Sequence, residues 1–157
     1  MSETQIFALT KKQNLILLGE CKNSFHGAKC IWEVLYKKYI PNNKYLDLEE
    51  LQKVWNLQRE EIDKCDKIIL ISTFDWFILY HDELPEYLTM LKQFIINHNL
   101  EENNNLKQQI NILEKTLNFN KYIGYVWNQT SVNECLWKDY NFNTYQVHFS
   151  IKTYYPS

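Results

Sequence analysis

The sequence predicts an α+β fold in a single globular domain, residues 1–157, with a mixed or mainly antiparallel sheet of about five to six strands packed with four to five helices. Three observations carry this prediction. The length is that of one ordinary domain, and a hydrophobic content of 45% is enough for a sizeable core. Segments with an apolar helical stripe are interspersed with short apolar or alternating segments. Their irregular order disfavours a doubly wound parallel sheet.

The N-terminal part begins with a predicted strand followed by a helix. The segment NLILLGE, residues 14–20, is short and apolar and is closed by Gly19, which indicates a buried strand. Ser24 is suited to cap the next helix, which ends before Pro41. The apolar face of this helix is expected to be Ala28, Ile31, Trp32, Leu35 and Tyr39.

The middle of the chain predicts a helix followed by a hairpin. Asp47 caps a helix over residues 47–58, whose apolar stripe is expected to be Leu48, Leu51, Val54 and Trp55. The segments KIILIST (residues 67–73) and WFILYHD (residues 76–82) are apolar and rich in isoleucine and aromatic residues. They predict two strands joined across Phe74 and Asp75.

Two further helices are predicted around a polar loop over residues 97–105. The first begins near Pro85, because proline and acidic side chains are favourable in a first helical turn. Its inward face is expected to be Tyr87, Leu88, Leu91, Phe94 and Ile95. The second covers residues 104–117, with Leu106, Ile110, Leu113 and Leu117 aligned on one face.

The C-terminal part predicts two more strands, over residues 122–128 and 145–152, with a short helix or loop between them. The last strand shows the clearest alternation, because every second residue is apolar and the residues between them are polar. Such a pattern is typical of a strand with one buried face and one wet face. The apolar positions are Tyr145, Val147, Phe149 and Ile151.

Charge is distributed unevenly along the chain. Residues 47–102 carry 13 acidic and 5 basic side chains, whereas residues 1–46 carry 3 acidic and 7 basic ones. Arg59 is the only arginine. Nucleic-acid binders depend on arginine contacts and on a basic face, so the sequence predicts no nucleic-acid binding.

Hydropathy and cysteine usage predict the compartment. No segment approaches the roughly 20 apolar residues of a membrane helix, and the first residues lack the basic-then-apolar order of a signal peptide. We therefore expect a cytoplasmic protein without membrane contact. In a reducing compartment the cysteines are expected to be free and mostly buried thiols: Cys21, Cys30, Cys65 and Cys135.

Several activities lose support because their motifs are missing. The chain has no phosphate-binding glycine loop, no dinucleotide-binding fingerprint, no H-E-x-x-H zinc motif, no C-x-x-C pair and no nucleophile elbow. With 3 glycines in 157 residues, a backbone cradle for phosphate is hard to build. The sequence therefore predicts no cofactor and disfavours an enzyme.

The segment LLGECKNSFHGAKC, residues 17–30, is the densest group of reactive side chains. Cys21, His26 and Cys30 invite three interpretations. Zinc binding would need a fourth ligand, and the spacing matches no known zinc knuckle. A nucleophilic Cys21 assisted by His26 would lack a third orienting group. The favoured interpretation is packing at the start of a helix, with no metal bound.

A polar pocket is the alternative site. Glu20 closes one buried strand, and the segment WNQTSVNE follows another, beginning at Trp127. Because pockets commonly open where buried strands end, these residues would line a small-molecule or enzyme site if the two strand ends converge. The predicted lining is Glu20, Cys21, Asn23, His26, Trp127, Asn128 and Gln129.

The acidic middle of the chain is the main functional clue. Seven carboxylates lie between residues 47 and 66, balanced only by Lys53, Arg59 and Lys64. Most such runs are solvated helix faces, but a field of one sign also attracts and selects an oppositely charged partner. Tryptophans such as Trp55 and Trp76 would supply hot spots. The predicted contact residues are Glu49, Glu50, Trp55, Glu60, Glu61, Asp63, Asp82, Glu83 and Glu86.

This profile resembles a known class of proteins. Small, glycine-poor, aromatic-rich α+β chains with an acidic face and no catalytic motif are similar to the immunity proteins of bacterial toxin–immunity systems. The resemblance covers the whole chain as a type and involves no specific motif. It implies a non-enzymatic inhibitor that binds one cognate basic toxin, such as a nuclease, and occludes its active site.

Overall fold

The computed structural model describes residues 3–22, 27–41, 44–129, 137 and 148–156. Within these residues the predicted α+β class is confirmed, with six α-helices and one four-stranded sheet. All strand pairs of the sheet are antiparallel. Of the predicted mixed or mainly antiparallel sheet, the second alternative is therefore the correct one. The expected five to six strands exceed the four that the described residues form, and the expected four to five helices fall short by one or two.

The sheet has the order β2-β1-β4-β3. Its strands are β1 (Glu3–Thr10), β2 (Leu15–Lys22), β3 (Leu79–Tyr80) and β4 (Tyr122–Gln129). The register places Gln5 of β1 opposite both Glu20 of β2 and Asn128 of β4. The ends of β2 and β4, which were predicted to form a pocket, therefore lie at the same end of the sheet with only β1 between them.

Strand β1 was not predicted from the sequence, because apolar side chains lie on both of its faces. Thr4, Ile6 and Ala8 are buried on the face toward the helices, while Leu9 belongs to a second, smaller cluster with Val126. Alternating side chains point to opposite faces of a strand. A strand apolar on both faces therefore lacks the period of two that would reveal it.

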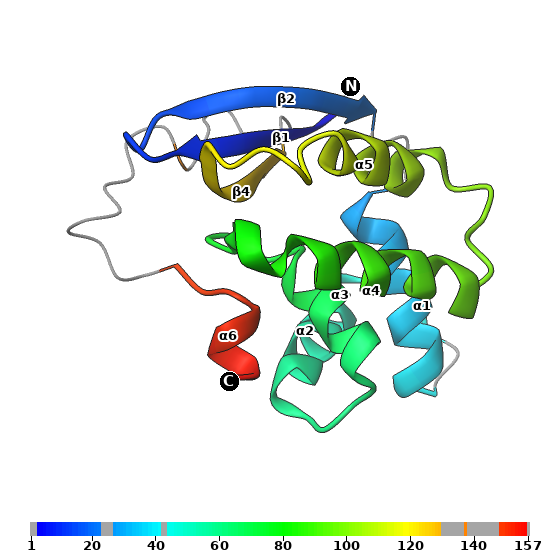
Figure 1. Cartoon of the computed structure of the whole chain (residues 1–157). Helices are drawn as coiled ribbons and strands as arrows, with labels where there is room; N and C mark the ends of the chain where they lie inside the picture. The colour runs from blue at the N-terminus through cyan, green and yellow to red at the C-terminus, as the bar shows by residue number, and fades with distance from the viewer. Residues whose placement is uncertain (1–2, 23–26, 42–43, 130–136, 138–147, 157) are drawn as a thin grey trace.

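The helices lie on one side of the sheet, and α2 and α6 are farthest from it (Figure 1). Helix α5 packs beside β2 and α4. Two short 3-10 helices, η1 (Leu57–Arg59) and η2 (His81–Glu83), precede α3 and α4. The α-helices are α1 (Ala28–Tyr39), α2 (Leu48–Asn56), α3 (Lys64–Ile71), α4 (Leu84–Asn97), α5 (Asn104–Glu114) and α6 (Ile151–Tyr154).

Helix termini follow the local chemistry closely. Asp47 caps α2 by accepting a hydrogen bond from the backbone N–H of Glu50, as predicted. Pro85 lies in the first turn of α4, also as predicted. Helix α1 begins at Ala28 with Gly27 as its N-cap, so the expected cap Ser24 lies upstream of the helix start and outside the described residues.

The predicted strand over residues 67–73 is wrong, because these residues belong mostly to helix α3. Four consecutive residues from Ile68 to Ile71 are fully buried, and a segment buried on all sides shows neither helical nor strand periodicity. Asp63 favours a helix here, because its side chain caps α3 by accepting a hydrogen bond from the backbone N–H of Asp66. The expected hairpin across Phe74 and Asp75 does not form, and β3 is only Leu79–Tyr80.

The last predicted strand is also largely wrong in its described part. Phe149 makes an isolated parallel bridge to Phe77, and Ile151 then begins helix α6. Ser150 and Thr153 form a reciprocal capping box that starts this helix. Tyr145 and Val147 lie outside the described residues.

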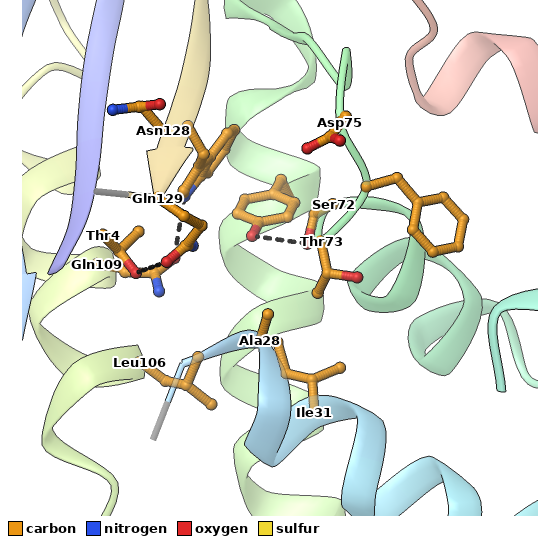
Figure 2. Close-up of a pocket in the computed structure, with 13 residues that line it drawn as sticks. Thr4, Ala28, Ile31, Ser72, Thr73, Asp75, Leu106, Gln109, Asn128 and Gln129 are labelled. Atoms are coloured by element: carbon orange, nitrogen blue, oxygen red, sulfur yellow. Dashed lines mark hydrogen bonds between the residues drawn. The ribbon is translucent and has the colours of Figure 1, made fainter. Parts of the chain in front are cut away.

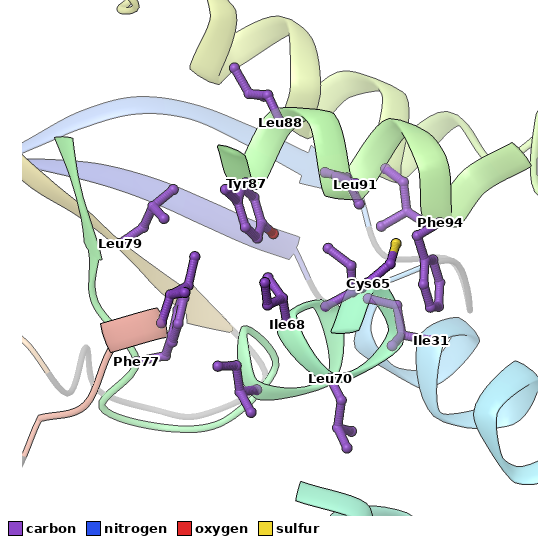
Figure 3. Packing of buried hydrophobic residues seen from close by; sticks show 14 of the residues in the cluster. Ile31, Cys65, Ile68, Leu70, Phe77, Leu79, Tyr87, Leu88, Leu91 and Phe94 are labelled. Carbon is purple, nitrogen blue, oxygen red and sulfur yellow. The ribbon is translucent and has the colours of Figure 1, made fainter. Parts of the chain in front are cut away.

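The main core lies between the sheet and the helices. Ile68 and Leu70 of α3 pack with Phe77, Tyr87 and their neighbours (Figure 3). The inward face predicted for α4 is confirmed, since all five of its predicted residues are buried. In α1 the predicted Ile31 and Leu35 are buried, together with Tyr36.

Helix α2 turns a different face inward from the one predicted. Leu48 is 70% exposed, whereas Glu50, Val54 and the following Leu57 are buried. Positions 50, 54 and 57 share one helical face. Glu50 can occupy the first of these buried positions because its carboxylate accepts hydrogen bonds from Tyr36 and Lys53.

No helix within the described part of the chain has both the length and the apolar run needed to cross a membrane.

Candidate functional site

The nine residues predicted to contact a basic partner occupy very different environments. Two of the carboxylates are buried, two form ion pairs at the surface, and four are exposed. The predicted contact residues therefore fall into three groups of carboxylates, which are buried, ion-paired or exposed.

Glu50 is buried and serves the fold. It is 2% exposed, and its carboxylate accepts hydrogen bonds from Tyr36 Oη at 3.0 Å and Lys53 Nζ at 2.9 Å. Buried carboxylates are stable only when paired in this way. Glu50 therefore joins α2 to α1 rather than facing a partner.

Glu83 and Trp55 are likewise turned inward. Glu83 is 5% exposed, and its Oε1 accepts a hydrogen bond from the backbone N–H of Tyr80. Burial raises the pKa of Glu83. Trp55 is half-buried with its ring edge-on to Trp32, at a centroid distance of 5.6 Å. Neither residue offers its polar group to solvent.

Asp82 and Glu86 are neutralised at the surface. Lys152 Nζ lies 2.8 Å from Asp82, and Lys64 Nζ lies 3.0 Å from Glu86. Both lysines come from other elements, so these ion pairs connect η2 to α6 and α4 to α3. The potential that these carboxylates present to a partner is therefore weakened.

The remaining four acidic residues are exposed. They belong to α2 and to the segment between α2 and α3, which lies at the end of the molecule opposite the sheet (Figure 1). Asp63 caps α3, and the carboxylates of Glu49, Glu60 and Glu61 make no ion pair within the described residues. Two nearby lysines are engaged elsewhere: Lys53 binds Glu50, and Lys67 donates to the backbone carbonyl of Glu60. The exposed Arg59 directly precedes Glu60 in the sequence. We call Glu49, Glu60, Glu61 and Asp63 the acidic end.

Two exposed apolar side chains lie shortly before Glu49 in the sequence, Leu48 next to it and Tyr45 four residues earlier. Tyr45 is 94% exposed and Leu48 is 70% exposed, the two highest values among large apolar residues in the described chain. Tyrosine beside charge is a common hot-spot composition in protein interfaces. From the sequence, Leu48 was expected in the core, and Trp55 and Trp76 were expected to be the interface hot spots.

Asp66 is the most deeply buried carboxylate of the region. Its side chain is fully buried and accepts hydrogen bonds from Lys38 Nζ at 2.7 Å, Tyr39 Oη at 2.6 Å and His98 Nε2 at 2.8 Å. Burial alone would raise the pKa of Asp66, but the hydrogen bonds from His98, Lys38 and Tyr39 outweigh it and hold the pKa below its ordinary value. This cluster joins α1, α3 and the end of α4.

The alternative pocket is only partly assembled. Gln5 donates to Glu20 at 2.9 Å and accepts from Asn128 at 2.8 Å, so the two strand ends do converge. A hydrogen bond with Glu20 also raises the pKa of the neighbouring Glu3. Gln5 has the same parity as Phe7 and Leu9, however, which places this row on the face away from the helices.

A cavity of about 90 Å³ opens on the helix side of the same sheet end (Figure 2). Of the residues in the alternative pocket, Trp127, Asn128 and Gln129 are among those that line this cavity, whereas Glu20 and the buried Cys21 are not. The amide of Asn128 itself donates to Gln5 on the other face of the sheet. Asn23 and His26 lie outside the described residues. The rest of the lining comes from all over the chain: Thr4, Ala28, Ile31, Ser72, Thr73, Phe74, Asp75, Tyr87, Leu106 and Gln109.

The rim of this cavity holds an unusual backbone conformation. Trp76 has a φ of 66°, a left-handed value that is rare for bulky residues. Its ring packs edge-on against Trp137 at a centroid distance of 5.2 Å, which helps to hold the turn that carries Phe74 and Asp75. Strain of this kind costs about 1–3 kcal/mol and often accompanies functional sites.

The three cysteines within the described residues are poorly suited to nucleophilic or metal chemistry. Burial raises the pKa of Cys21 to about 11 and that of Cys65 to about 12, and it also raises the pKa of the half-buried Cys30. A nucleophile or zinc ligand needs the opposite shift. Within the described residues no three histidine, cysteine or acidic side chains gather as a metal site, and all three described cysteines are free.

Comparison with known proteins finds no matching family model, no similar curated protein and no similar solved structure.

Proposed function

We propose that this chain is a non-enzymatic binding protein of the immunity type, which neutralises one basic bacterial toxin by docking through its acidic end. The supporting observation is the set of exposed carboxylates of Glu49, Glu60 and Glu61, which lack ion-pair partners among the described residues. The partner is a single protein domain with a positive active-site cleft.

Electrostatics explains why these carboxylates suit recognition. An excess of charges of one sign projects a field that steers a positive partner and speeds association. Tyr45 and Leu48 add apolar area beside Glu49, which slows dissociation. The buried Glu50 keeps α2 in place on α1 and so fixes the orientation of this surface.

The test compares two charge-reversed variants that differ only in where the charges lie. The triple variant Glu49→Lys, Glu60→Lys, Glu61→Lys changes the acidic end. The control Glu33→Lys, Glu101→Lys, Glu102→Lys changes three other exposed glutamates by the same total charge. Each untagged protein is used as bait in a lysate of the source organism, and the retained proteins are quantified by mass spectrometry.

The wild type and the control variant are expected to retain the same basic protein in near-equal amount, with less retained as salt rises. The acidic-end variant is expected to lose it. The captured protein is then expressed in bacteria, where the wild type relieves its toxicity and the acidic-end variant does not. Equal capture by both variants would contradict the proposed surface, and a captured partner without toxicity would contradict the proposed activity.

A further inference from the structure

The cavity between the sheet and the helices is a site of its own, separate from the acidic end. Trp127 and Gln109 line it beside the sheet, Ser72 and Asp75 line it at the end of α3, and α1 closes it below (Figure 2). A volume of about 90 Å³ accommodates the head group of a small molecule, since liquid water occupies about 30 Å³ per molecule.

Protons in the lining are already committed to protein partners. Ser72 Oγ donates to the carbonyl of Ile69 at 2.7 Å, and Thr73 Oγ1 donates to the carbonyl of Leu70 at 2.7 Å. Tyr87 Oη donates to Ser72 Oγ at 3.4 Å, and Trp127 Nε1 donates to Gln109 Oε1 at 3.1 Å. Each of these hydroxyl and indole protons is therefore used within the protein.

The acceptors of Ser72, Thr73 and Asp75 are less fully used. A hydroxyl oxygen has two lone pairs, and Ser72 Oγ and Thr73 Oγ1 each accept one hydrogen bond, from Tyr87 and Trp32 respectively. The carboxylate of Asp75 points toward the cavity (Figure 2). The lining therefore offers acceptors and favours a ligand that donates hydrogen bonds.

Charge in the lining has one sign. The lining includes Asp75, which is also exposed to solvent, and no lysine, arginine or histidine among its thirteen described residues. The negative end of the α3 dipole at Ser72 adds to it, and the positive end of the α1 dipole at Ala28 opposes it with about half a charge. Phe74, Tyr87 and Trp127 make part of the lining aromatic, and aromatic rings attract cations that lie over their faces.

We propose that this cavity binds a primary ammonium group, held by Asp75, by the hydroxyl oxygens of Ser72 and Thr73, and by the aromatic lining. An ammonium group has three donors and no acceptor, which matches the unused lone pairs of Ser72 and Thr73 and the carboxylate of Asp75. The group comes either from a small free amine or from a lysine side chain. This site does not depend on the proposed docking function.

The test is a titration followed by the ¹H–¹⁵N signal of the Trp127 indole, assigned with a Trp127→Phe variant. The probes are propylammonium chloride and its neutral counterpart 1-propanol. A second pair, Nα-acetyl-lysine methylamide and Nα-acetyl-norleucine methylamide, represents a lysine side chain. Tighter binding of the lysine derivative than of propylammonium identifies a peptide source, and the reverse order identifies a free amine.

The cationic member of each pair is expected to shift the indole signal, and the Asp75→Asn variant is expected to weaken its binding about fivefold to tenfold. Asp82→Asn is the matched control, because Asp82 is exposed and pairs with Lys152 away from the cavity. If Asp75→Asn does not fold, Ser72→Ala tests the same lining. Equal binding of the neutral counterparts, no indole shift with either cation, or unchanged affinity in Asp75→Asn would overturn the proposal.

Discussion

Asp66 and Glu61 lie five residues apart, yet they belong to opposite regions of the molecule. Asp66 is fully buried between three helices and accepts hydrogen bonds from Lys38, Tyr39 and His98. Glu61 is exposed in the loop before α3, with no ion pair among the described residues. The difference shows that an acidic sequence segment combines carboxylates that hold the fold with carboxylates that are available to a partner.

The largest expected effect is on the buried side of this comparison. Asp66→Asn removes the charge that faces Lys38 and is expected to lower the free energy of unfolding by about 3 kcal/mol, because breaking a buried charge pair leaves the other members uncompensated. Lys38 is half exposed, which keeps the cost at the lower end of the range. Urea unfolding followed by circular dichroism measures it. Glu61→Gln, the control, is expected to change the value by less than about 0.5 kcal/mol; similar costs for both variants would refute the distinction.

Glu50 and Glu49 make the same comparison between neighbours in one helix. Glu50→Gln is expected to cost about 1–2 kcal/mol, because it weakens charge-assisted hydrogen bonds from Tyr36 and Lys53. Glu49→Gln is expected to leave the unfolding free energy nearly unchanged and to slow association with the basic partner. Thermal unfolding and association kinetics separate the two effects. A stable Glu50→Gln protein with slowed association would place Glu50 at the interface instead.

Acid should act on Asp66 specifically. Its pKa is lower in the folded protein than the ordinary value of 3.8, so its contribution to stability is complete above that value. This contribution is lost as the pH falls through the lower folded value. The stability gap between the wild type and Asp66→Asn is therefore expected to narrow as the pH drops below about 4. Urea unfolding at several pH values measures the gap, and a constant gap would show that the charge of Asp66 is not responsible.

The smallest expected effect is at the acidic end. The triple variant Glu49→Gln, Glu60→Gln, Glu61→Gln should keep the unfolding free energy within about 0.5 kcal/mol, because exposed carboxylates without ion pairs contribute little to folding. Guanidinium unfolding measures this. A loss of about 2 kcal/mol or more would mean that these residues support the fold, and would weaken their assignment to recognition.

Local sequence chemistry predicted the elements that have clear ends. Asp47 and Pro85 mark helix starts because a side-chain cap and a missing N–H act within a single turn. Strands β2 and β4 were likewise found from short apolar runs. Strand β2, however, continues past Gly19 to Lys22 and is largely exposed rather than buried, because it lies at the edge of the sheet. Ile68–Ile71 was misassigned because complete burial removes the periodicity on which such predictions depend.

The candidate sites depended more on packing. Trp127 was predicted as a pocket residue because it ends a buried strand, and it does line the cavity. Thr4, Ser72 and Gln109 join it only because β1, α3 and α5 converge there, and no local pattern marks them. Glu50 lies four residues before the apolar Val54, and this helical spacing was a usable signal for the burial of Glu50. The hydroxyl that makes the burial possible belongs to Tyr36, which lies on another helix.

The sequence by itself determined the α+β class, the capped helices, the scarcity of phosphate-binding motifs and the excess of acidic residues between positions 47 and 102. These properties depend on composition and on neighbours within one helical turn or one strand. The tertiary structure alone decided which carboxylates are buried, which are paired and which stay exposed, and which strand end faces a cavity. Such outcomes depend on contacts between residues far apart in the chain, as between Asp66 and His98, and these contacts exist only once the helices have packed on the sheet.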